Sequence, residues 1–243
     1  MHNRDDRLNN ALLACLSDEA WARWRHMSDV LALEPGQSMD QGSGATACVY
    51  FPLGAVVALH AITEEGAYSE LAVVGREGMV GISGFMGGGS FFSRAIVLKG
   101  GPMLRISAVD LRREVQNSQH MLMCALRYTQ ALVTHIAQTG VCNRHHSIDQ
   151  ALRRWLLMSL DRVGGESLHM THELMARLLG VRREGITEAA ARLQHQGLIR
   201  YARGRITVTD RDSLARGGCE CYQVVKSEYE RLLDHQPIWP GLH

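Results

Sequence analysis

Three changes of pattern along the 243-residue chain predict an α+β fold. Residues 31–107 are rich in glycine and in short apolar runs, a pattern typical of β-strands separated by turns. From residue 109 apolar residues recur at alternating steps of four and three, which predicts a long α-helix. Residues 171–210 then combine two helical patterns with two strand patterns. The predicted domains are residues 1–108, 109–143 and 144–216, followed by a C-terminal tail of residues 217–243.

The first domain is predicted to begin with helices and to continue as a β-sandwich or jelly roll. Residues 8–16 have a helical pattern, and Ser17 is a predicted N-cap for a second helix. Turn signals at Pro35-Gly36, Gly42–Gly44, Glu64–Gly66 and Gly87–Gly89 separate short strands, a spacing that favours a sandwich or jelly roll. The predicted strands are residues 47–51, 56–62, 69–74, 94–98 and 103–107.

The helical pattern between residues 109 and 139 resembles a heptad repeat. A helix of that length with an apolar stripe needs a partner, so the pattern predicts pairing with a twin helix. The alternative is that the helix lies against its own β domain, and both arrangements are compatible. A second predicted helix, residues 148–163, leads to the last domain. The residues predicted to form the dimer contact are Leu111, Val115, Leu122, Ala125, Thr129, Leu132 and Ile136.

Residues 171–210 predict a winged helix-turn-helix. One helix begins at Thr171 and is broken at Gly180, and a second ends at Gly197. Strands at 198–202 and 205–209, joined by an Arg203-Gly204 turn, form the predicted wing. The alternative is an ordinary helix pair with a solvated, charged outer face. The apolar residues that share one face of the second helix are Ile186, Ala189, Ala190 and Leu193.

The charge distribution favours the interpretation that this domain binds DNA. Residues 144–216 contain 13 arginines and 8 acidic residues, an excess of five positive charges, whereas residues 1–143 contain 11 basic and 13 acidic residues. Neutralisation of phosphates dominates affinity for nucleic acids, and arginine makes paired contacts to guanine and phosphate. The residues predicted to contact DNA are Thr171, Arg182, Arg183, Glu184, Thr187, Glu188, Arg192, Arg203 and Arg205.

This order of parts resembles the Crp/Fnr superfamily of bacterial transcription regulators over about residues 31–214. The segment GVRREGITEAAARL is similar to the family's turn and recognition helix, and VYFPLGAVVAL and EPGQ are similar to its β domain. The resemblance implies a homodimer that binds a roughly palindromic double-stranded DNA site, with RNA polymerase as a further partner. It places Arg183 and Glu184 at base-reading positions. Glu188 takes a third position, commonly arginine, so we expect a half-site that differs there.

The resemblance also implies a cyclic-nucleotide-binding-like effector domain, but the expected ligand residues differ. Ile82 stands where cyclic-AMP-binding members have a glutamate for the ribose, and the arginine of Ser93-Arg94-Ala95 is displaced by one position. A shift of one residue along a strand turns the side chain to the other face. We therefore do not expect cyclic AMP to be the effector, whose identity is unknown; another nucleotide or small molecule remains open. The candidate contacts are Gly81, Ile82, Gly84, Ser93 and Arg94, together with the glycine-rich segment Gly84–Gly89.

Composition predicts a soluble, cytoplasmic protein without a membrane segment, because the chain has no run of eighteen apolar residues and no signal-peptide pattern at its start. Six cysteines are scattered without a CxxC motif, so no metal site is expected. Cys142, His145 and His146 are candidates for a partial metal or haem site, but three such residues within one turn more often lie on an exposed helix edge.

The alternative from a different functional class is a cupin-like metal-dependent enzyme whose helical tail supports dimerisation. Such an enzyme requires two histidines on one strand and a carboxylate that converge on a metal. The predicted strands contain only His60. The chain also lacks a phosphate-binding loop, an HExxH helix and a recognisable Ser/His/Asp set. We therefore do not expect an enzyme.

Overall fold

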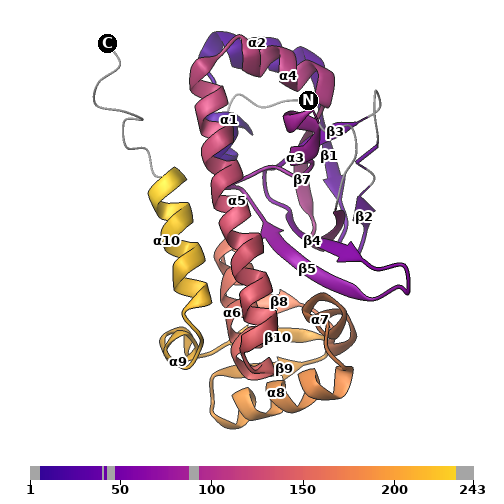
Figure 1. Cartoon of the computed structure of the whole chain (residues 1–243), viewed down its shortest axis with the longest axis vertical. Coiled ribbons are helices and arrows are strands. Elements are labelled where there is room, and N and C mark those ends of the chain that lie inside the picture. The colour runs from indigo at the N-terminus through magenta and orange to yellow at the C-terminus, as the bar shows by residue number, and fades with distance from the viewer. Residues whose placement is uncertain (1–5, 40, 43–46, 88–92, 234–243) are drawn as a thin grey trace.

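The computed structural model describes residues 6–39, 41–42, 47–87 and 93–233. It has the predicted α+β architecture, with a β domain, a long helix α5 (Gln119–His145) and a C-terminal helical domain with a small sheet. Figure 1 shows the β domain beside the upper part of α5 and the C-terminal domain around its lower end. Among the described helices, none combines the length and apolar character needed to span a membrane.

The β domain consists of two antiparallel sheets, with strand orders β1-β7-β3 and β2-β6-β4-β5. All five predicted strands are present with shifts of at most two residues at their ends. Two strands and the short helix α3 (Ile82–Met86) escaped prediction, because β1 follows a helix without a turn signal and β2 has only two residues. Ser43, Gly44, Gly88 and Gly89, which belong to predicted turns, lie outside the described residues. The strands are β1 (Ser28–Leu33), β2 (Ser38–Met39), β3 (Cys48–Pro52), β4 (Val56–Ile62), β5 (Tyr68–Val74), β6 (Arg94–Lys99) and β7 (Gly101–Ser107).

The helical pattern predicted over residues 8–16 is present, divided into two short elements. A 3-10 turn, η1 (Asp6–Asn9), is followed by the short helix α1 (Ala11–Ala14). Asn10 separates them, since its side-chain oxygen accepts from the amides of Leu12 and Leu13 and caps α1. Its amide group donates to two carbonyl oxygens of the β domain. The predicted cap at Ser17 is confirmed, and α2 (Asp18–Met27) follows it.

The continuous helix predicted from residue 109 is also wrong, because two helices share its period. Helix α4 (Ala108–Gln116) ends at Asn117, and Ser118 accepts a hydrogen bond from the amide of Met121 to start α5. The dimer contacts predicted at Leu111 and Val115 therefore lie on α4. Both side chains are buried within the chain. Periodicity continued across the break because each helix has its own apolar face.

The C-terminal domain confirms the predicted winged helix-turn-helix and adds a strand to it. Helix α6 (Ile148–Val163) has the predicted bounds and begins with a capping box between Ser147 and Gln150. The three-stranded sheet has the order β8-β10-β9, so β8 extends the wing. The remaining elements of this domain are β8 (Ser167–His169), α7 (His172–Leu179), α8 (Arg183–His195), β9 (Ile199–Ala202), β10 (Arg205–Val208) and α9 (Arg211–Arg216).

The predicted C-terminal tail contains a further helix, α10 (Cys221–Leu233), while residues 234–243 lie outside the described part. Helix α10 packs on α5 and α6. Its buried Tyr229 meets the His135 ring of α5 edge-on, with ring centres 5.9 Å apart, and the Arg162 guanidinium of α6 lies 5.1 Å from its ring centre. The tail is therefore part of the core around the long helix.

Strand β5 joins the β domain to the C-terminal domain, since it contacts α5, α6 and α7. The Arg177 guanidinium of α7 lies 4.1 Å from the centre of the Tyr68 ring. Glu70 is buried at this junction and accepts a hydrogen bond from the Trp155 indole of α6. Burial raises the pKa of Glu70 to about 7, although the charge of Arg154 and the bond from Trp155 act in the opposite direction.

Candidate nucleic-acid interface

The turn between α7 and α8 is fixed by a cap at each end of α7. The side-chain oxygen of Thr171 accepts from the amide of Leu174 at 3.2 Å, so this predicted DNA contact also starts the helix. Gly180 ends the helix with a φ of 65°, in the left-handed region that favours glycine. A Cβ at Gly180 would lie 3.3 Å from the carbonyl oxygen of Tyr68, so the turn also packs closely on the β domain.

Helix α8 has the two faces that the sequence predicts. Ile186, Ala189, Ala190 and Leu193 are buried. Arg182 is the N-cap and makes no side-chain capping bond, so the first amides of α8 have no side-chain acceptor from that residue. Such amides favour an anionic oxygen at a helix start. The predicted base-reading and phosphate-binding side chains on the outer face are all exposed, namely Arg182, Arg183, Glu184, Thr187, Glu188 and Arg192.

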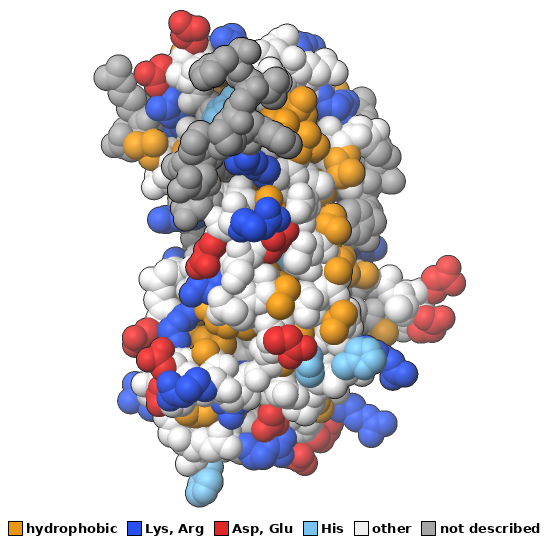
Figure 2. Space-filling view, turned by 60° about the vertical axis from the view of Figure 1, so that its left-hand side comes forward, with side chains coloured by type: hydrophobic (Ala, Val, Ile, Leu, Met, Phe, Trp, Pro, Cys, Tyr) orange, Lys and Arg blue, Asp and Glu red, His pale blue; other side chains and the backbone are white. Residues whose placement is uncertain are grey.

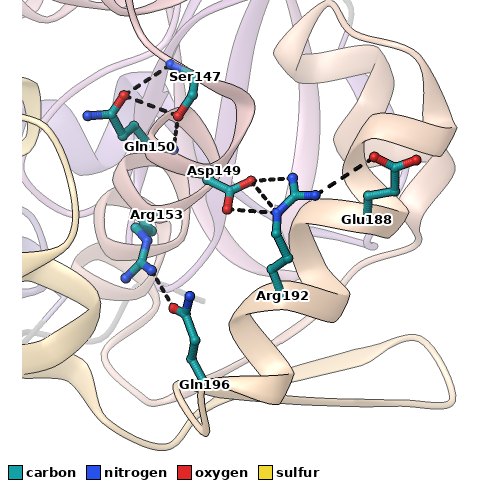
Figure 3. Close-up of polar contacts among 7 residues, drawn as sticks. All are labelled: Ser147, Asp149, Gln150, Arg153, Glu188, Arg192 and Gln196. Carbon is teal, nitrogen blue, oxygen red and sulfur yellow. Dashed lines mark hydrogen bonds and ion pairs between the residues drawn. The ribbon is translucent and has the colours of Figure 1, made fainter.

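Arg192 is held by acidic side chains rather than projecting freely. Figure 3 shows it between Asp149 of α6 and Glu188 of its own helix. Its Nη2 lies 2.6 Å from one oxygen of Asp149, its Nε also donates to that carboxylate, and its Nη1 lies 3.8 Å from Glu188. The two-pronged pair braces α8 against α6. Arg192 also lies within ion-pair distance of Glu188 on its own helix.

A cluster that sequence analysis missed links α7, α8 and the wing. The His172 ring stacks on Tyr201 of β9 with centres 4.3 Å apart, and His172 Nδ1 lies 3.0 Å from the hydroxyl of Thr187. That hydroxyl also donates to the carbonyl of Arg183. Burial, and then the charge of Arg183, lower the pKa of His172 below its usual value. A histidine one position after a helix cap carries no sequence signal for this role.

The wing presents its predicted arginines on a tight turn. Arg203 has a φ of 50° and is the one non-glycine residue with a left-handed backbone among the described residues. This conformation is costly for a side chain with a Cβ, so the turn carries some backbone strain. Arg205 is exposed, and its Nη2 donates to the Ser167 hydroxyl of β8 at 2.8 Å.

The candidate effector residues do not form one surface among the described residues. Ile82 is buried and Gly81 has a φ of 95°, at the start of α3. The carbonyl of Gly84 accepts from Arg112 Nη1 at 2.6 Å. The carbonyl of Ser93 accepts from Gln41, whereas Arg94 is exposed at the start of β6.

The residues predicted to form the dimer contact on α5 are only partly accessible in the single chain. Ala125 and Leu132 are buried within the chain, and Leu122, Thr129 and Ile136 are half-buried. A different stripe is exposed. At 100° per residue it lies on the side of α5 opposite its buried face. Its exposed residues are Leu126, Gln130, Val133, Ala137, Gly140 and Val141.

We name these six residues the outer stripe of α5. Leu126, Val133 and Val141 are 46%, 59% and 44% exposed, which is high for large apolar side chains. A Cβ at Gly140 would have no atom within 4 Å, so the backbone is open to close approach there. Figure 2 shows hydrophobic side chains in a broken column down the face that it draws.

The comparisons with known proteins agree with this architecture. Residues 150–216 match the family model of the Crp-like helix-turn-helix domain. A protein from Eubacterium rectale assigned to the Crp/Fnr family is 19% identical, covers 89% of this chain and 99% of its own, and has a TM-score of 0.66. Among curated proteins, none matches this chain.

Two further solved structures have the same fold. A CRP-family transcriptional regulator from Thermus thermophilus is 16% identical, with coverage of 76% of this chain and 95% of its own and a TM-score of 0.64. The c-di-GMP-responsive global regulator CLP from Xanthomonas campestris is 14% identical, with coverage of 79% and 99% and a TM-score of 0.62. Residues 150–216 therefore form a Crp-like helix-turn-helix domain, and the chain has the fold of the Crp/Fnr family of transcription regulators.

Proposed function

We propose that the protein is a homodimeric transcription regulator that binds a specific, roughly palindromic DNA site. The observation that carries the proposal is the outer face of α8, where Arg183, Glu184, Thr187 and Glu188 are all exposed. A helix of this kind enters a major groove, where arginine pairs with guanine and a carboxylate accepts from the amino group of cytosine. Arg203 and Arg205 on the wing supply phosphate contacts that are independent of base sequence.

The outer stripe of α5 supports the homodimer. It is too apolar for a solvated helix face, and pairing with the same stripe of a second copy would bury Leu126, Val133 and Val141. A glycine in an exposed helix destabilises the helix by about 1 kcal/mol relative to alanine. Close packing of a partner helix against Gly140 would compensate for that cost. Two α8 helices, one from each copy, would then contact half-sites about one turn of DNA apart.

The four segments predicted from sequence remain the proposed domain division, with residues 1–108 as the effector-binding-like part. For this part we propose an effector other than cyclic AMP. Ile82 cannot accept hydrogen bonds from ribose hydroxyls, and its side chain is buried. Another nucleotide is compatible with the fold, since the regulator CLP is c-di-GMP-responsive. We further propose that the protein contacts RNA polymerase and is located in the cytoplasm.

The cupin-like alternative has little support from His60. Its ring is buried and stacks on Tyr68 with centres 5.2 Å apart, and burial lowers its pKa. Among the described residues, the His, Cys, Asp and Glu groups that converge closely enough to hold a metal do not include His60. We therefore propose a regulator rather than an enzyme.

Selection from a pool of random DNA duplexes tests the proposed function. The full-length protein should enrich a palindromic motif whose half-sites lie about one helical turn apart. Fluorescence titration on the selected duplex should give an affinity at least about a thousandfold higher than on random duplex at the same salt concentration. Recovery of random sequences, or equal affinity for both duplexes, would remove sequence-specific regulation from the proposal.

Calorimetry tests the effector proposal separately. Cyclic AMP should not bind in the micromolar range and, at up to millimolar concentration, should leave the affinity for the selected duplex unchanged. Loss of one charge-assisted bond to the ribose weakens binding by roughly tenfold to hundredfold. Micromolar binding of cyclic AMP that raises DNA affinity would contradict the assignment of Ile82.

A further inference from the structure

Four side chains that are far apart in the sequence converge where α5 ends. Cys142 lies in the last turn of α5, and His146 is the C-cap of that helix. Cys219 lies in the loop before α10, and Cys221 is the first residue of α10. One ligand atom from each lies within 4.8 Å of all the others. Cys142 and Cys221 are buried, while Cys219 and His146 are half-buried. We name this set the Cys3His cluster.

The spacing of the Cys3His cluster suits a single metal ion. Zinc binds sulfur at about 2.3 Å and imidazole nitrogen at about 2.0 Å in a tetrahedron, so its ligands lie about 3.8 Å (S to S) and about 3.5 Å (S to N) apart. Cys142 Sγ lies 3.7 Å from Cys219 Sγ, and Cys221 Sγ lies 3.4 Å from His146 Nδ1. An iron–sulfur cluster places several metal and sulfide atoms between its cysteines and needs a wider set.

A second layer of side chains orients two members of the cluster. The other imidazole nitrogen of His146, Nε2, lies 3.5 Å from a carboxylate oxygen of Glu220. Gln138 on α5 donates from Nε2 to Cys221 Sγ at 3.2 Å. Histidines that bind metals commonly give their second nitrogen to a carboxylate, which fixes the tautomer and the ring. Glu220 therefore presents Nδ1 of His146 to the three sulfur atoms.

The charge of the surroundings also favours a metal–thiolate centre. Arg154 is buried and donates to the hydroxyl of Thr139, one turn before Cys142 on α5. Its Nε and Nη2 have no hydrogen-bond partner among the described residues. Three thiolates around a divalent ion carry a net charge of −1. A buried cation one turn away would compensate that charge.

We propose that Cys142, His146, Cys219 and Cys221 bind one zinc ion in a closed tetrahedral site that ties the end of α5 to the start of α10. Four protein ligands leave no open position, so the site is structural rather than catalytic. Sulfur-rich tetrahedral sites select zinc among the common divalent ions. The sequence expectation of no metal rested on the missing CxxC motif. The cluster instead combines a CxxxH segment with a CxC segment that the fold brings together, while His145 is exposed and lies outside it.

Metal analysis of the full-length protein, purified without chelator, is the first test. Wild type should retain one zinc per chain, and titration of the metal-free protein with Co²⁺ should give the intense visible bands of tetrahedral thiolate coordination. Cys142→Ser and Cys221→Ser should lose most of the bound zinc. Cys48→Ser, which removes a half-buried cysteine outside the cluster, should retain it.

A milder variant covers the case in which a cysteine variant does not fold. Glu220→Gln keeps the four ligands but weakens the orientation of His146, so chelator competition should show zinc affinity lowered by about tenfold to hundredfold. Glu230→Gln, which lies on α10 and away from the cluster, should leave the affinity unchanged. Wild type without stoichiometric zinc and with weak, octahedral Co²⁺ bands would overturn the proposal. So would a Cys142–Cys219 disulfide in protein prepared without oxygen. DNA affinity plays no part in these readouts, so their failure is separate from failure of the proposed function.

Discussion

The C-terminal domain and the β domain present their candidate sites in opposite ways. In the C-terminal domain, the charged side chains stand on the outer face of one regular helix and on a short turn, and all are exposed. In the β domain, Ile82 is buried, the carbonyl of Gly84 is occupied by Arg112, and Arg94 is exposed on a different element. The exposed face of a single helix can be predicted from the helical period of the sequence alone. A ligand site built from a loop, a short helix and a strand depends on tertiary contacts that the period does not encode.

The largest expected effect concerns α5, the helix that both domains share. Val133→Glu should place a charge in the outer stripe, where burial in a dimer would cost several kcal/mol. The variant should be monomeric at micromolar concentration by light scattering, should keep its thermal stability as a monomer, and should bind the palindromic duplex more weakly. A dimeric Val133→Glu protein would show that the outer stripe is not the interface.

Leu132→Ala is the matched control, since Leu132 is the adjacent residue but is buried within the chain. It should lower the free energy of unfolding by about 2 to 5 kcal/mol through a cavity and should leave the folded protein dimeric. The heptad-like pattern predicts Leu132 in the dimer contact. A monomeric, stable Leu132→Ala protein would restore that assignment.

The next effect concerns the junction of the two domains at Glu70. Because burial raises its pKa to about 7 from an unfolded value near 4.5, the stability that its protonated form provides is complete below about pH 4.5 and is lost as the pH rises through about 7. The loss from this group alone is on the order of 3 kcal/mol. Glu70→Gln should therefore remove that part of the decline, as measured by denaturant unfolding between pH 5 and pH 8.

The control for this prediction is Glu64→Gln, in the exposed turn between β4 and β5. It should follow the wild-type profile. If Glu70→Gln also kept the full wild-type decline, the junction would owe its pH dependence to other groups.

The smallest expected effect lies within the C-terminal domain. Asp149→Asn removes the charge that holds Arg192, and exposed pairs of this kind contribute below about 1 kcal/mol to stability. Thermal unfolding should therefore change little. Selection of DNA sites should still show a changed preference at the base pair that Glu188 contacts. Arg192 lies 3.8 Å from Glu188, and in the variant Asp149 would no longer hold it. An unchanged motif would mean that Arg192 does not position Glu188.

The sequence predicted most of this architecture because caps and breaks are local. Thr171, Gly180 and Ser147 fix their helix ends through bonds within a few residues, so α6, α7 and α8 follow from the sequence to within one or two residues. The outer face of α8 could be predicted for the same reason, because the helical period is a local property of the sequence. The break at Asn10 was not predicted, because its side chain is also held by the carbonyl oxygens of the distant residues Pro52 and Gly78.

The burial pattern of α5 and the convergence of the Cys3His cluster could not be predicted from the sequence, for a common reason. Apolar period places residues on an arc of the helix but does not distinguish the part that faces the chain from the part that faces outward. Helix α10, which the sequence pattern does not predict, covers one side of α5. Cys219 lies just before α10 and Cys221 is its first residue. Without α10, Cys142 and His146 are two ligands at one helix end. Such information is present only in the tertiary structure.

The most direct test of DNA recognition by α8 is the specificity ratio of Arg183→Ala. Affinities of wild type and variant are measured on the selected duplex and on random duplex at several salt concentrations. Loss of Arg183 should weaken specific binding by about 1 to 3 kcal/mol and lower the ratio, whereas Arg203→Ala on the wing should weaken both duplexes alike and reduce the salt slope by about one. If Arg183→Ala kept the wild-type ratio, α8 would not be the element that recognises the sequence.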